Sequence, residues 1–248
     1  MGKLGTRLSN IVDLEGVLLI DKPPHCTSHD VVSRVRKKLK MQRIGHAGTL
    51  DPLATGLLII LVGKATQISQ HLMSLDKEYQ GTCQFGEITD TQDSSGIVLA
   101  VRTVPDQLVR EELQITANEF LGDQYQIPPM FSAKKINGVA LYKLARKGQV
   151  VARTPRFIHI SRFNICSYQT PLAEFIINCS KGTYIRTIVH DFGQKIGCGA
   201  HMTQLRRTAT DLFNINQCTK LSEFEEMSLE VIKKRLIPIC EAVPRRVL

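Results

Sequence analysis

The chain has 248 residues and a formal charge of +9, from 32 Lys and Arg against 23 Asp and Glu. Its composition, 43% hydrophobic and 22% charged, is that of a globular protein and excludes disorder throughout. The longest apolar run, "LLIILV" at 57–62, is far shorter than the ~20 residues of a membrane span. The first fifteen residues also lack the apolar segment of a secretory signal. We therefore expect no membrane partner.

The seven cysteines are scattered, and none forms a C-x-x-C pair. Cysteines spaced in this way predict free thiols in a reducing compartment, so we expect a cytoplasmic protein. The absence of closely spaced Cys and His pairs predicts no bound metal.

The positive charge is concentrated in two places, and the whole net charge lies within residues 1–220. Residues 134–162 hold eight basic residues and no acidic one. A charge run is often only a solvated surface, but two clusters of one sign favour a polyanion partner such as nucleic acid. The second cluster follows the first expected helix and comprises Arg34, Arg36, Lys37, Lys38, Lys40 and Arg43.

Strands and helices alternate without a regular βαβ order, which predicts an α+β fold with a mixed sheet. Ser28 is the expected N-cap of the first helix, whose apolar stripe is Val31, Val32, Val35 and Leu39. In chain order the expected elements are a strand at 16–21, a helix from Ser28, a loop at 43–56, a strand at 57–63, a helix at 64–75, a strand at 77–86, an exposed hairpin loop or mobile flap at 87–96, helices at 108–121 and 139–148, strands at 156–168 and 172–180, a helix at 184–197, a strand at 201–215 and a last helix near 229–236.

The loop at 43–56 contains the most unusual carboxylate of the chain. Asp51 lies between Leu50 and Pro52, and the proline favours an extended backbone that would hold the carboxylate in one direction. A carboxylate among leucines needs a cationic partner to stay charged. The loop fits neither G-x-x-x-x-G-K-[ST] nor G-x-G-x-x-G, so a nucleotide-binding loop is disfavoured. From the residues alone, an ordinary turn or surface residue is the favoured interpretation of Asp51, and an ordinary loop histidine that of His46 in the same loop.

Several segments of the chain resemble motifs of the TruB family of pseudouridine synthases, and they occur in the same order as in that family. The segment "GHAGTLDPLATGLL" at 45–58 is similar to the catalytic motif of that family. Further similar segments are "LLIDKPPHCTSHDVV" at 18–32, "DKEYQG" at 76–81, "PPMFSAKKINGVALYKLARKG" at 128–148, "CSKGTYIRTIVHDFG" at 179–193 and "LRRTATDLF" at 205–213.

The resemblance implies conversion of a uridine in tRNA, the T-loop uridine 55, to pseudouridine without cofactor or metal. It also implies a mixed, largely antiparallel sheet flanked by helices and loops, the pseudouridine synthase fold. Asp51 corresponds to the essential aspartate and Arg186 to the arginine that pairs with it. Tyr79 and Leu205 correspond to the two residues that enclose the uracil, and His46 to the histidine that fills the space left by the flipped base.

The family resemblance also predicts how the substrate is held. Residues 1–220 would form the catalytic domain, including an insertion at about 128–155 that grips the T arm. Residues 221–248 would form a tail too short for a PUA domain, which argues against a guide RNA. We expect a monomer whose insertion contacts RNA through Lys134, Lys135, Arg146 and Lys147.

Two other readings stay open. A non-catalytic RNA-binding protein or RNA chaperone could keep the fold without the chemistry, although it would have no need of an aspartate facing a polyanion. An unrelated basic interaction module is the third reading, and the ordered motifs disfavour it. Tritium release from [5-³H]uridine tRNA, compared between the wild type and Asp51→Ala, distinguishes a tRNA pseudouridine synthase from these two alternatives.

Overall fold

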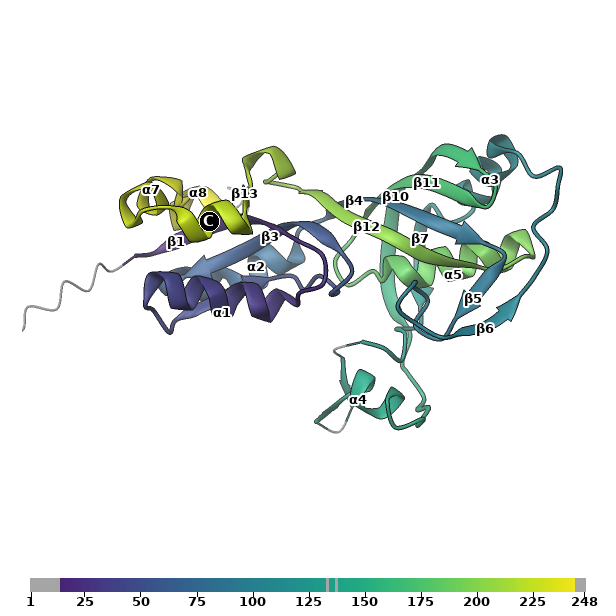
Figure 1. The fold of residues 1–248 in the computed structure, drawn as a ribbon, viewed down its shortest axis with the longest axis horizontal. Coiled ribbons are helices and arrows are strands. Elements are labelled where there is room, and N and C mark those ends of the chain that lie inside the picture. Colours follow the sequence, from purple (N-terminus) through teal and green to yellow (C-terminus); the bar gives the residue numbers. More distant parts are fainter. Residues whose placement is uncertain (1–13, 133, 137, 244–248) are drawn as a thin grey trace, which may run out of the picture.

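A nine-stranded mixed sheet runs through the whole molecule (Figure 1). The computed structural model describes residues 14–132, 134–136 and 138–243. The strand order is β13-β1-β3-β12-β4-β11-β10-β7, with β2 beside β3, and only β1–β13 and β3–β12 are parallel. The expected α+β class with a largely antiparallel sheet is confirmed. The strands of this sheet are β1 (Gly16–Lys22), β2 (Ile44–Ala47), β3 (Thr55–Val62), β4 (Lys77–Phe85), β7 (Gly122–Gln126), β10 (Arg156–Gln169), β11 (Leu172–Cys179), β12 (Ala200–Thr210) and β13 (Thr219–Lys220).

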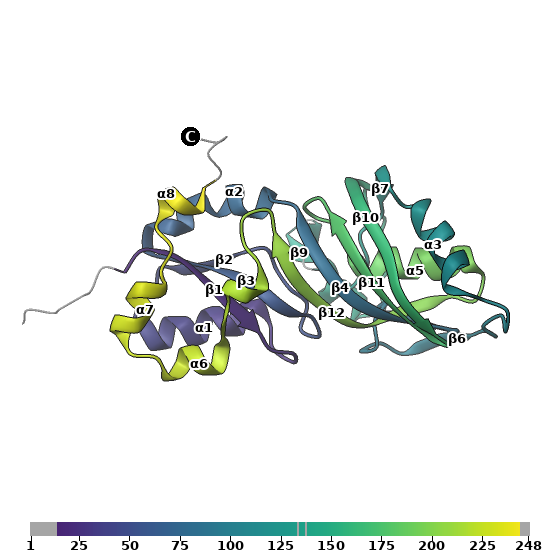
Figure 2. The same ribbon diagram turned by 90° about the horizontal axis from the view of Figure 1, so that it is seen from above.

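Helices cover both faces of the sheet in the half that contains β1, β2 and β3 (Figure 2). Strand β3 is buried on both faces, which is why it reads as a continuous apolar run. Leu58 and Ile60 pack toward α1, whereas Leu57 and Ile59 pack in a second cluster with Leu72 of α2. The helices are α1 (Ser28–Leu39), α2 (Ser69–Ser74), α3 (Arg110–Asn118), α4 (Leu141–Ala145), α5 (Ile185–Ile196), α6 (Leu221–Glu226), α7 (Leu229–Arg235) and α8 (Ile239–Ala242), with 3-10 turns at Gly63–Ile68 and Ile215–Gln217. None of the helices within the described ranges is both long and apolar enough to cross a membrane.

Helix α1 begins with a capping box whose N-cap lies one residue before the expected Ser28. The N-cap is Thr27: its hydroxyl accepts a hydrogen bond from the Asp30 N–H at 3.0 Å. In return, the Asp30 carboxylate accepts one from the Thr27 N–H at 2.8 Å. The prediction of Ser28 as N-cap is therefore wrong, because Asp30 lies three residues after Thr27, as a capping box requires. The apolar stripe, including Val31 and Leu39, is buried as predicted.

The sheet has a narrow joint where its two halves meet. Strands β3 and β12 pair only through Arg206 with Thr55 and Arg207 with Gly56. Gly56 has a φ of +99°, and a Cβ there would lie 2.3 Å from the Arg207 carbonyl oxygen, so only glycine fits. The predicted loop at 43–56 is too long, because its ends pair as β2 and the start of β3. The remaining loop, residues 48–54, leads directly into this joint.

The segment at 87–96 forms the hairpin that was one of its two predicted states, but this hairpin is only partly exposed. It begins as β5 (Glu87–Thr89), which pairs with β6 (Val98–Val101), and its turn is fixed to β12. The Ser94 N–H donates to the Met202 carbonyl at 2.9 Å, and the Met202 N–H donates to the Gln92 carbonyl at 3.1 Å. Asp93 is 4% exposed. The predicted exposure is wrong at Asp93, because a polar residue can be buried where its hydrogen bonds are satisfied, and composition does not reveal this.

The segment after β12 contains more structure than the single helix expected near 229–236. That helix is α7, but α6 and α8 flank it, and β13 pairs with β1. Phe224 and Ile232 are fully buried against the main core. Val17 and Ile237 exchange two backbone hydrogen bonds of 2.9 Å. The tail therefore packs along the edge of the sheet.

The basic insertion projects away from the sheet (Figure 1). It contains the short hairpin of β8 (Lys135–Ile136) and β9 (Val139–Ala140), followed by α4. Leu141 is buried, whereas the turn after α4 is exposed. In α3, Leu113 and Ala117 are buried, whereas Ile115 is 66% exposed.

Candidate active site

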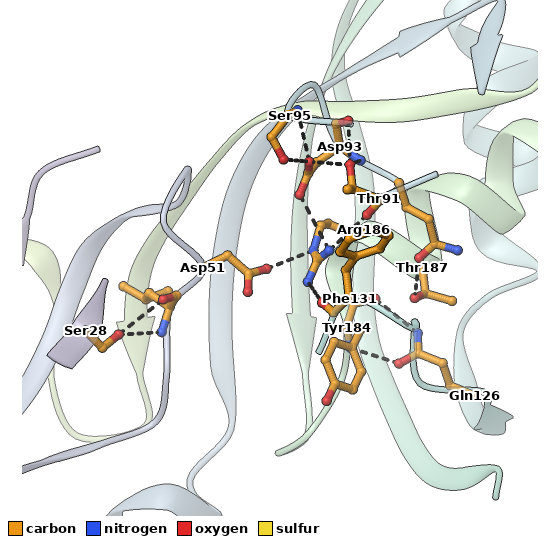
Figure 3. Close-up of polar contacts among 12 residues, drawn as sticks. Ser28, Asp51, Thr91, Asp93, Ser95, Gln126, Phe131, Tyr184, Arg186 and Thr187 are labelled. Carbon is orange, nitrogen blue, oxygen red and sulfur yellow. Dashed lines mark hydrogen bonds and ion pairs between the residues drawn. The ribbon is translucent and has the colours of Figure 1, made fainter. Parts of the chain in front are cut away.

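The loop that carries Asp51 is held on both sides of that residue. The Ser28 hydroxyl accepts from the Leu50 N–H at 2.9 Å and lies 3.2 Å from the Leu50 carbonyl oxygen, to which it donates. On the other side, the Pro52 carbonyl accepts from the His25 N–H at 2.9 Å and from Lys22 Nζ at 3.3 Å. Asp51 is thus fixed between helix α1 and the end of β1, and Figure 3 shows the contacts of Ser28 on the α1 side.

Lys22 supplies a buried cation beneath the loop. Its side chain is fully buried, and Nζ also donates to the carbonyls of Pro23 at 2.9 Å and Cys26 at 2.7 Å. Burial lowers the pKa of Lys22, and the nearby Asp51 carboxylate opposes this effect. Three carbonyl acceptors compensate for the water that the ammonium loses.

Asp51 points at the guanidinium of Arg186 (Figure 3). Oδ2 of Asp51 lies 2.8 Å from Nε of Arg186. The arginine side chain is 4% exposed, whereas that of Asp51 is 38% exposed. The family resemblance implied this pair, whose two members stand 135 positions apart in the sequence. The geometry leaves part of the carboxylate accessible to a substrate while its direction is fixed.

Arg186 has three further partners that fix its orientation. Nη1 donates to the Thr91 carbonyl at 2.9 Å and lies 3.5 Å from Oδ2 of Asp93. Nη2 donates to the Phe131 carbonyl at 3.0 Å. Asp93 is held by the Thr91 hydroxyl at 2.7 Å and by the Ser95 N–H at 3.0 Å. The guanidinium is therefore shared between a buried carboxylate and the more accessible Asp51.

The start of helix α5 positions Arg186. The Gln126 amide nitrogen donates to the Tyr184 carbonyl at 3.1 Å, and its oxygen accepts from the Tyr184 N–H at 2.8 Å. The Thr187 hydroxyl donates to Gln92 Oε1 at 2.8 Å. The first turn of α5 is thus attached both to β7 and to the turn after β5.

A cleft of ≈ 690 Å³ opens over the Asp51–Arg186 pair. Tyr79 on β4 and Leu205 on β12 line it from the sheet, and they are 8% and 7% exposed. Their strands are direct neighbours, since Leu205 pairs with Gly81 and Arg207 with Tyr79. An aromatic ring, an aliphatic side chain and a carboxylate therefore line one space. This combination suits a planar polar ring such as a nucleobase.

Two ionisable groups of the cleft are shifted by burial. Burial raises the pKa of Tyr79, and the adjacent Arg207 guanidinium opposes the rise. Burial lowers the pKa of Lys77 from 10.5 to about 8, and the charge of Arg207 adds to this effect. The Lys77 ammonium donates to the Met73 carbonyl at 2.7 Å and to that of Leu75. Arg207 is 1% exposed and donates to the carbonyls of Leu57 at 2.7 Å and Gly48 at 3.2 Å.

The other predicted site residues lie outside this group. His46 is half-buried on β2, and it does not line the cleft; burial and the charge of Arg207 lower its pKa. Lys134 Nζ lies 3.5 Å from the Thr154 carbonyl, and Arg146 stands over the Tyr142 ring at 5.5 Å. Lys147 is exposed after α4. Nothing is described of the side chain of Lys135, which belongs to β8.

Sequence reasoning missed Asp93, Lys77 and Arg207. Lys77 and Arg207 stand inside the motifs at 76–81 and 205–213, two residues from Tyr79 and Leu205, so strand alternation could have placed them near the cleft. Asp93 gave no such signal, because its segment reads as a polar loop. Within the described ranges, no group of three or more His, Cys, Asp or Glu residues is arranged to hold a metal ion.

The cleft thus belongs to an enzyme that holds a planar base beside a carboxylate, and comparison with known proteins gives its family. Residues 36–185 match the TruB family pseudouridylate synthase N-terminal domain, and residues 186–243 match the tRNA pseudouridylate synthase B C-terminal domain. The chain belongs to the TruB family.

Individual relatives agree with this family. The chain is 56% identical over 232 residues to tRNA pseudouridine synthase B of Opitutus terrae, covering 94% of this chain and 96% of that protein. It is 44% identical to the protein of the same name from Syntrophotalea carbinolica, covering 93% of this chain and 75% of that one. Among solved structures, a chain of a Cbf5–Nop10–Gar1 complex superposes with a TM-score of 0.71 at 28% identity. That superposition covers 92% of this chain and 61% of the other.

Proposed function

We propose that this protein isomerises the T-loop uridine 55 of tRNA to pseudouridine, with Asp51 as the catalytic residue. In this reaction the N1–C1′ glycosidic bond breaks and a C5–C1′ bond forms. The C5 proton leaves and N1 gains a proton, so atoms and electrons balance without a cofactor. The observation that carries the proposal is the accessible Asp51 carboxylate, paired at 2.8 Å with buried Arg186 inside the cleft.

The cleft fits the steps that the reaction demands. A uridine inside a folded loop must leave its stack before its glycosidic bond can be reached. Tyr79 and Leu205 would enclose the detached uracil, so that it turns without escaping. Arg186 would keep the Asp51 carboxylate aimed at the nucleotide during this rotation, because its other contacts leave it no alternative orientation.

The insertion at about 128–155 would grip the T arm of the tRNA. Its start borders the cleft through Ser132, and its exposed end carries Arg146 and Lys147. Cations on a projecting segment are available to phosphates at some distance from the reacting uridine. In this proposal residues 1–220 form the catalytic domain, and 221–248 form a tail that supports β1.

We further propose a cytoplasmic monomer that needs no guide RNA. The relative from Opitutus terrae, which this chain covers almost completely, carries the name of a tRNA-modifying synthase. Purified protein should therefore convert a tRNA transcript when no other RNA is present. In analytical ultracentrifugation it should sediment as a single chain. Strict dependence of turnover on an added RNA would refute this part.

The test of the proposed function is tritium release from a [5-³H]uridine tRNA transcript. We expect release by the wild type and none by Asp51→Asn, while tRNA binding by the variant stays within about twofold. Asp106→Asn, which removes an exposed carboxylate outside the cleft, should behave as the wild type. Binding without release by the wild type would instead favour the non-catalytic RNA-binding reading.

A further inference from the structure

An exposed aromatic pair lies at the outer wall of the cleft. Tyr125 on β7 and Phe157 on β10 are directly opposite each other in the sheet register. Their rings meet edge to face, with centroids 5.9 Å apart and planes at 75°. Tyr125 is 75% exposed and Phe157 58% exposed. Large aromatic side chains this exposed are typical of surfaces that contact a partner.

The pair is continuous with the cleft. Phe157 itself lines the cleft that contains Asp51 and Arg186, and Tyr125 extends the same surface outward to the edge of the sheet. The neighbouring residue Ile158 points to the opposite face and is fully buried in the core, so Phe157 faces away from the core. Any chain that enters the cleft from the β7 edge passes over these rings.

The charges around the pair favour a polyanion. Arg156 and Lys181 line the cleft beside Phe157, and Lys181 is exposed. Arg156 Nη1 donates to the Gly182 carbonyl at 3.0 Å, which holds the guanidinium at the mouth. The carboxylate next along this face, Asp123, lies 2.6 Å from Nδ1 of His159 and is therefore already engaged. Aromatic rings beside cations form the surface on which unpaired bases stack.

We propose that Tyr125 and Phe157 form a stacking platform for an unpaired base of the RNA substrate, next to the uridine held in the cleft. This inference rests on the proposed function for the identity of the RNA. Single-stranded loops are recognised in this way because their bases can leave the stack and lie against an aromatic face. The platform then contributes to the affinity for the substrate and leaves the isomerisation step itself unchanged.

Kinetics with the tRNA transcript test the platform. Phe157→Leu and Tyr125→Leu should each raise KM about tenfold, the usual effect of removing one base stack, with kcat within twofold. Phe157→Tyr should retain the wild-type KM, because any aromatic ring offers a stacking face. Leu99→Ala, at a similarly exposed apolar position on β6, is the matched control and should have no effect. Equal KM values for Phe157→Leu and Phe157→Tyr would overturn the proposal.

Fluorescence gives a second readout that does not depend on catalysis. The chain contains no tryptophan, so Phe157→Trp in the Asp51→Asn background reports on that single position. We expect its emission to be quenched by the tRNA transcript but not by heparin, which carries charge without bases. The control Leu99→Trp should respond to neither. Quenching by both polyanions, or a change with protein concentration alone, would show a charge effect or self-association and overturn the platform.

The two proposals fail in different ways. If the wild type releases no tritium, the proposed function is wrong, yet the Phe157→Trp titration still measures base stacking. If the wild type converts the transcript but KM and emission do not respond at Phe157 and Tyr125, only the platform is wrong. The melting temperatures of the variants establish that they are folded, which the exposure of both rings leads us to expect.

Discussion

At the scale of single residues, the site depends on how the guanidinium of Arg186 is shared among its hydrogen-bond and ion-pair partners. Arg186 contacts Asp51, Asp93 and two carbonyls, and it is almost completely buried. A buried charge that loses its partner costs far more than an exposed one, because no water replaces the contact. Arg186 therefore acts on both the stability of the fold and the direction of Asp51.

The first prediction is that Arg186 and Asp93 are energetically coupled. Arg186→Met should lower the free energy of unfolding by about 3 kcal/mol, because the 6% exposed Asp93 side chain loses its cation. Adding Asp93→Asn should restore part of this loss, giving a coupling energy of about 1 kcal/mol or more. Urea unfolding of the two single variants, the double variant and the wild type measures it. Strictly additive losses would mean that the two residues do not interact.

The second prediction concerns Lys77 and pH. Its pKa is about 8 in the folded protein against 10.5 when unfolded, so the unfolded chain binds more protons between these values. The free energy of unfolding of the wild type should therefore rise with pH from 8 to 10.5, relative to Lys77→Met. Over this whole pH range the free energy of unfolding of the wild type should rise by about 3 kcal/mol relative to Lys77→Met, since each pKa unit corresponds to ~1.4 kcal/mol. Below about pH 7, where Lys77 is protonated in both states, the difference should be constant.

Urea unfolding of both proteins at pH 7, 8, 9 and 10, under reducing conditions, checks the Lys77 prediction. Other groups that titrate in this range cancel in the comparison. Parallel curves for the wild type and Lys77→Met would show that Lys77 keeps an ordinary proton affinity in the folded state.

At the scale of elements, the start of helix α1 performs two separate tasks. Thr27 caps the helix, whereas Ser28 ties the Leu50 backbone and so holds the loop of Asp51. The first task is a matter of helix stability, and the second concerns the position of a catalytic carboxylate. Neighbouring hydroxyl groups thus act on different properties of the protein.

The third prediction separates the two hydroxyl groups. Thr27→Ala should cost about 1 kcal/mol of stability, the usual value for an N-cap, with kcat within about twofold. Ser28→Ala should lower kcat several-fold, because the buried Leu50 backbone groups lose their partner and the loop shifts. Thermal unfolding and tritium release from tRNA measure the two effects. A kcat unchanged in Ser28→Ala would show that the loop holds its position without this bond.

The elements also show where sequence analysis succeeds and where it stops. The buried run of β3 and the stripe of α5, with Ile188 and Phe192 on one face, were predictable because local periodicity reflects local burial. The Asp51–Arg186 pair was predictable only through the family resemblance. The burial of Asp93 was not predictable, because Arg186, the cation that it contacts, lies 93 residues later in the chain. Periodicity carries no information on such a distant partner.

At the scale of the whole molecule, helix α6 of the tail contacts one of the two basic clusters, the one at 34–43, and so occupies cations that could otherwise bind RNA. Arg34 lies 3.5 Å from the Glu225 carboxylate of α6, and Lys38 donates to the Glu225 carbonyl. In the same cluster, Arg36 donates to the Ile44 carbonyl at 2.7 Å. Arg43 also donates to the Thr66 hydroxyl at 3.0 Å, so four of the six cations in this cluster make contacts within the protein. The cations after α4 remain exposed on a projecting segment, so the two clusters should differ in their contact with RNA.

The last prediction compares two variants that remove the same charge. Replacing Lys143, Arg146 and Lys147 by Gln should flatten the salt dependence of tRNA binding by about one unit of slope for each phosphate that the protein no longer neutralises. Replacing Lys37, Lys40 and Arg43, which are exposed in the basic cluster at 34–43, should leave the slope nearly unchanged. Both variants lose three charges, so long-range attraction falls equally. Binding across a salt series therefore isolates direct phosphate binding, and equal slopes for the two variants would show that the insertion acts only through net charge.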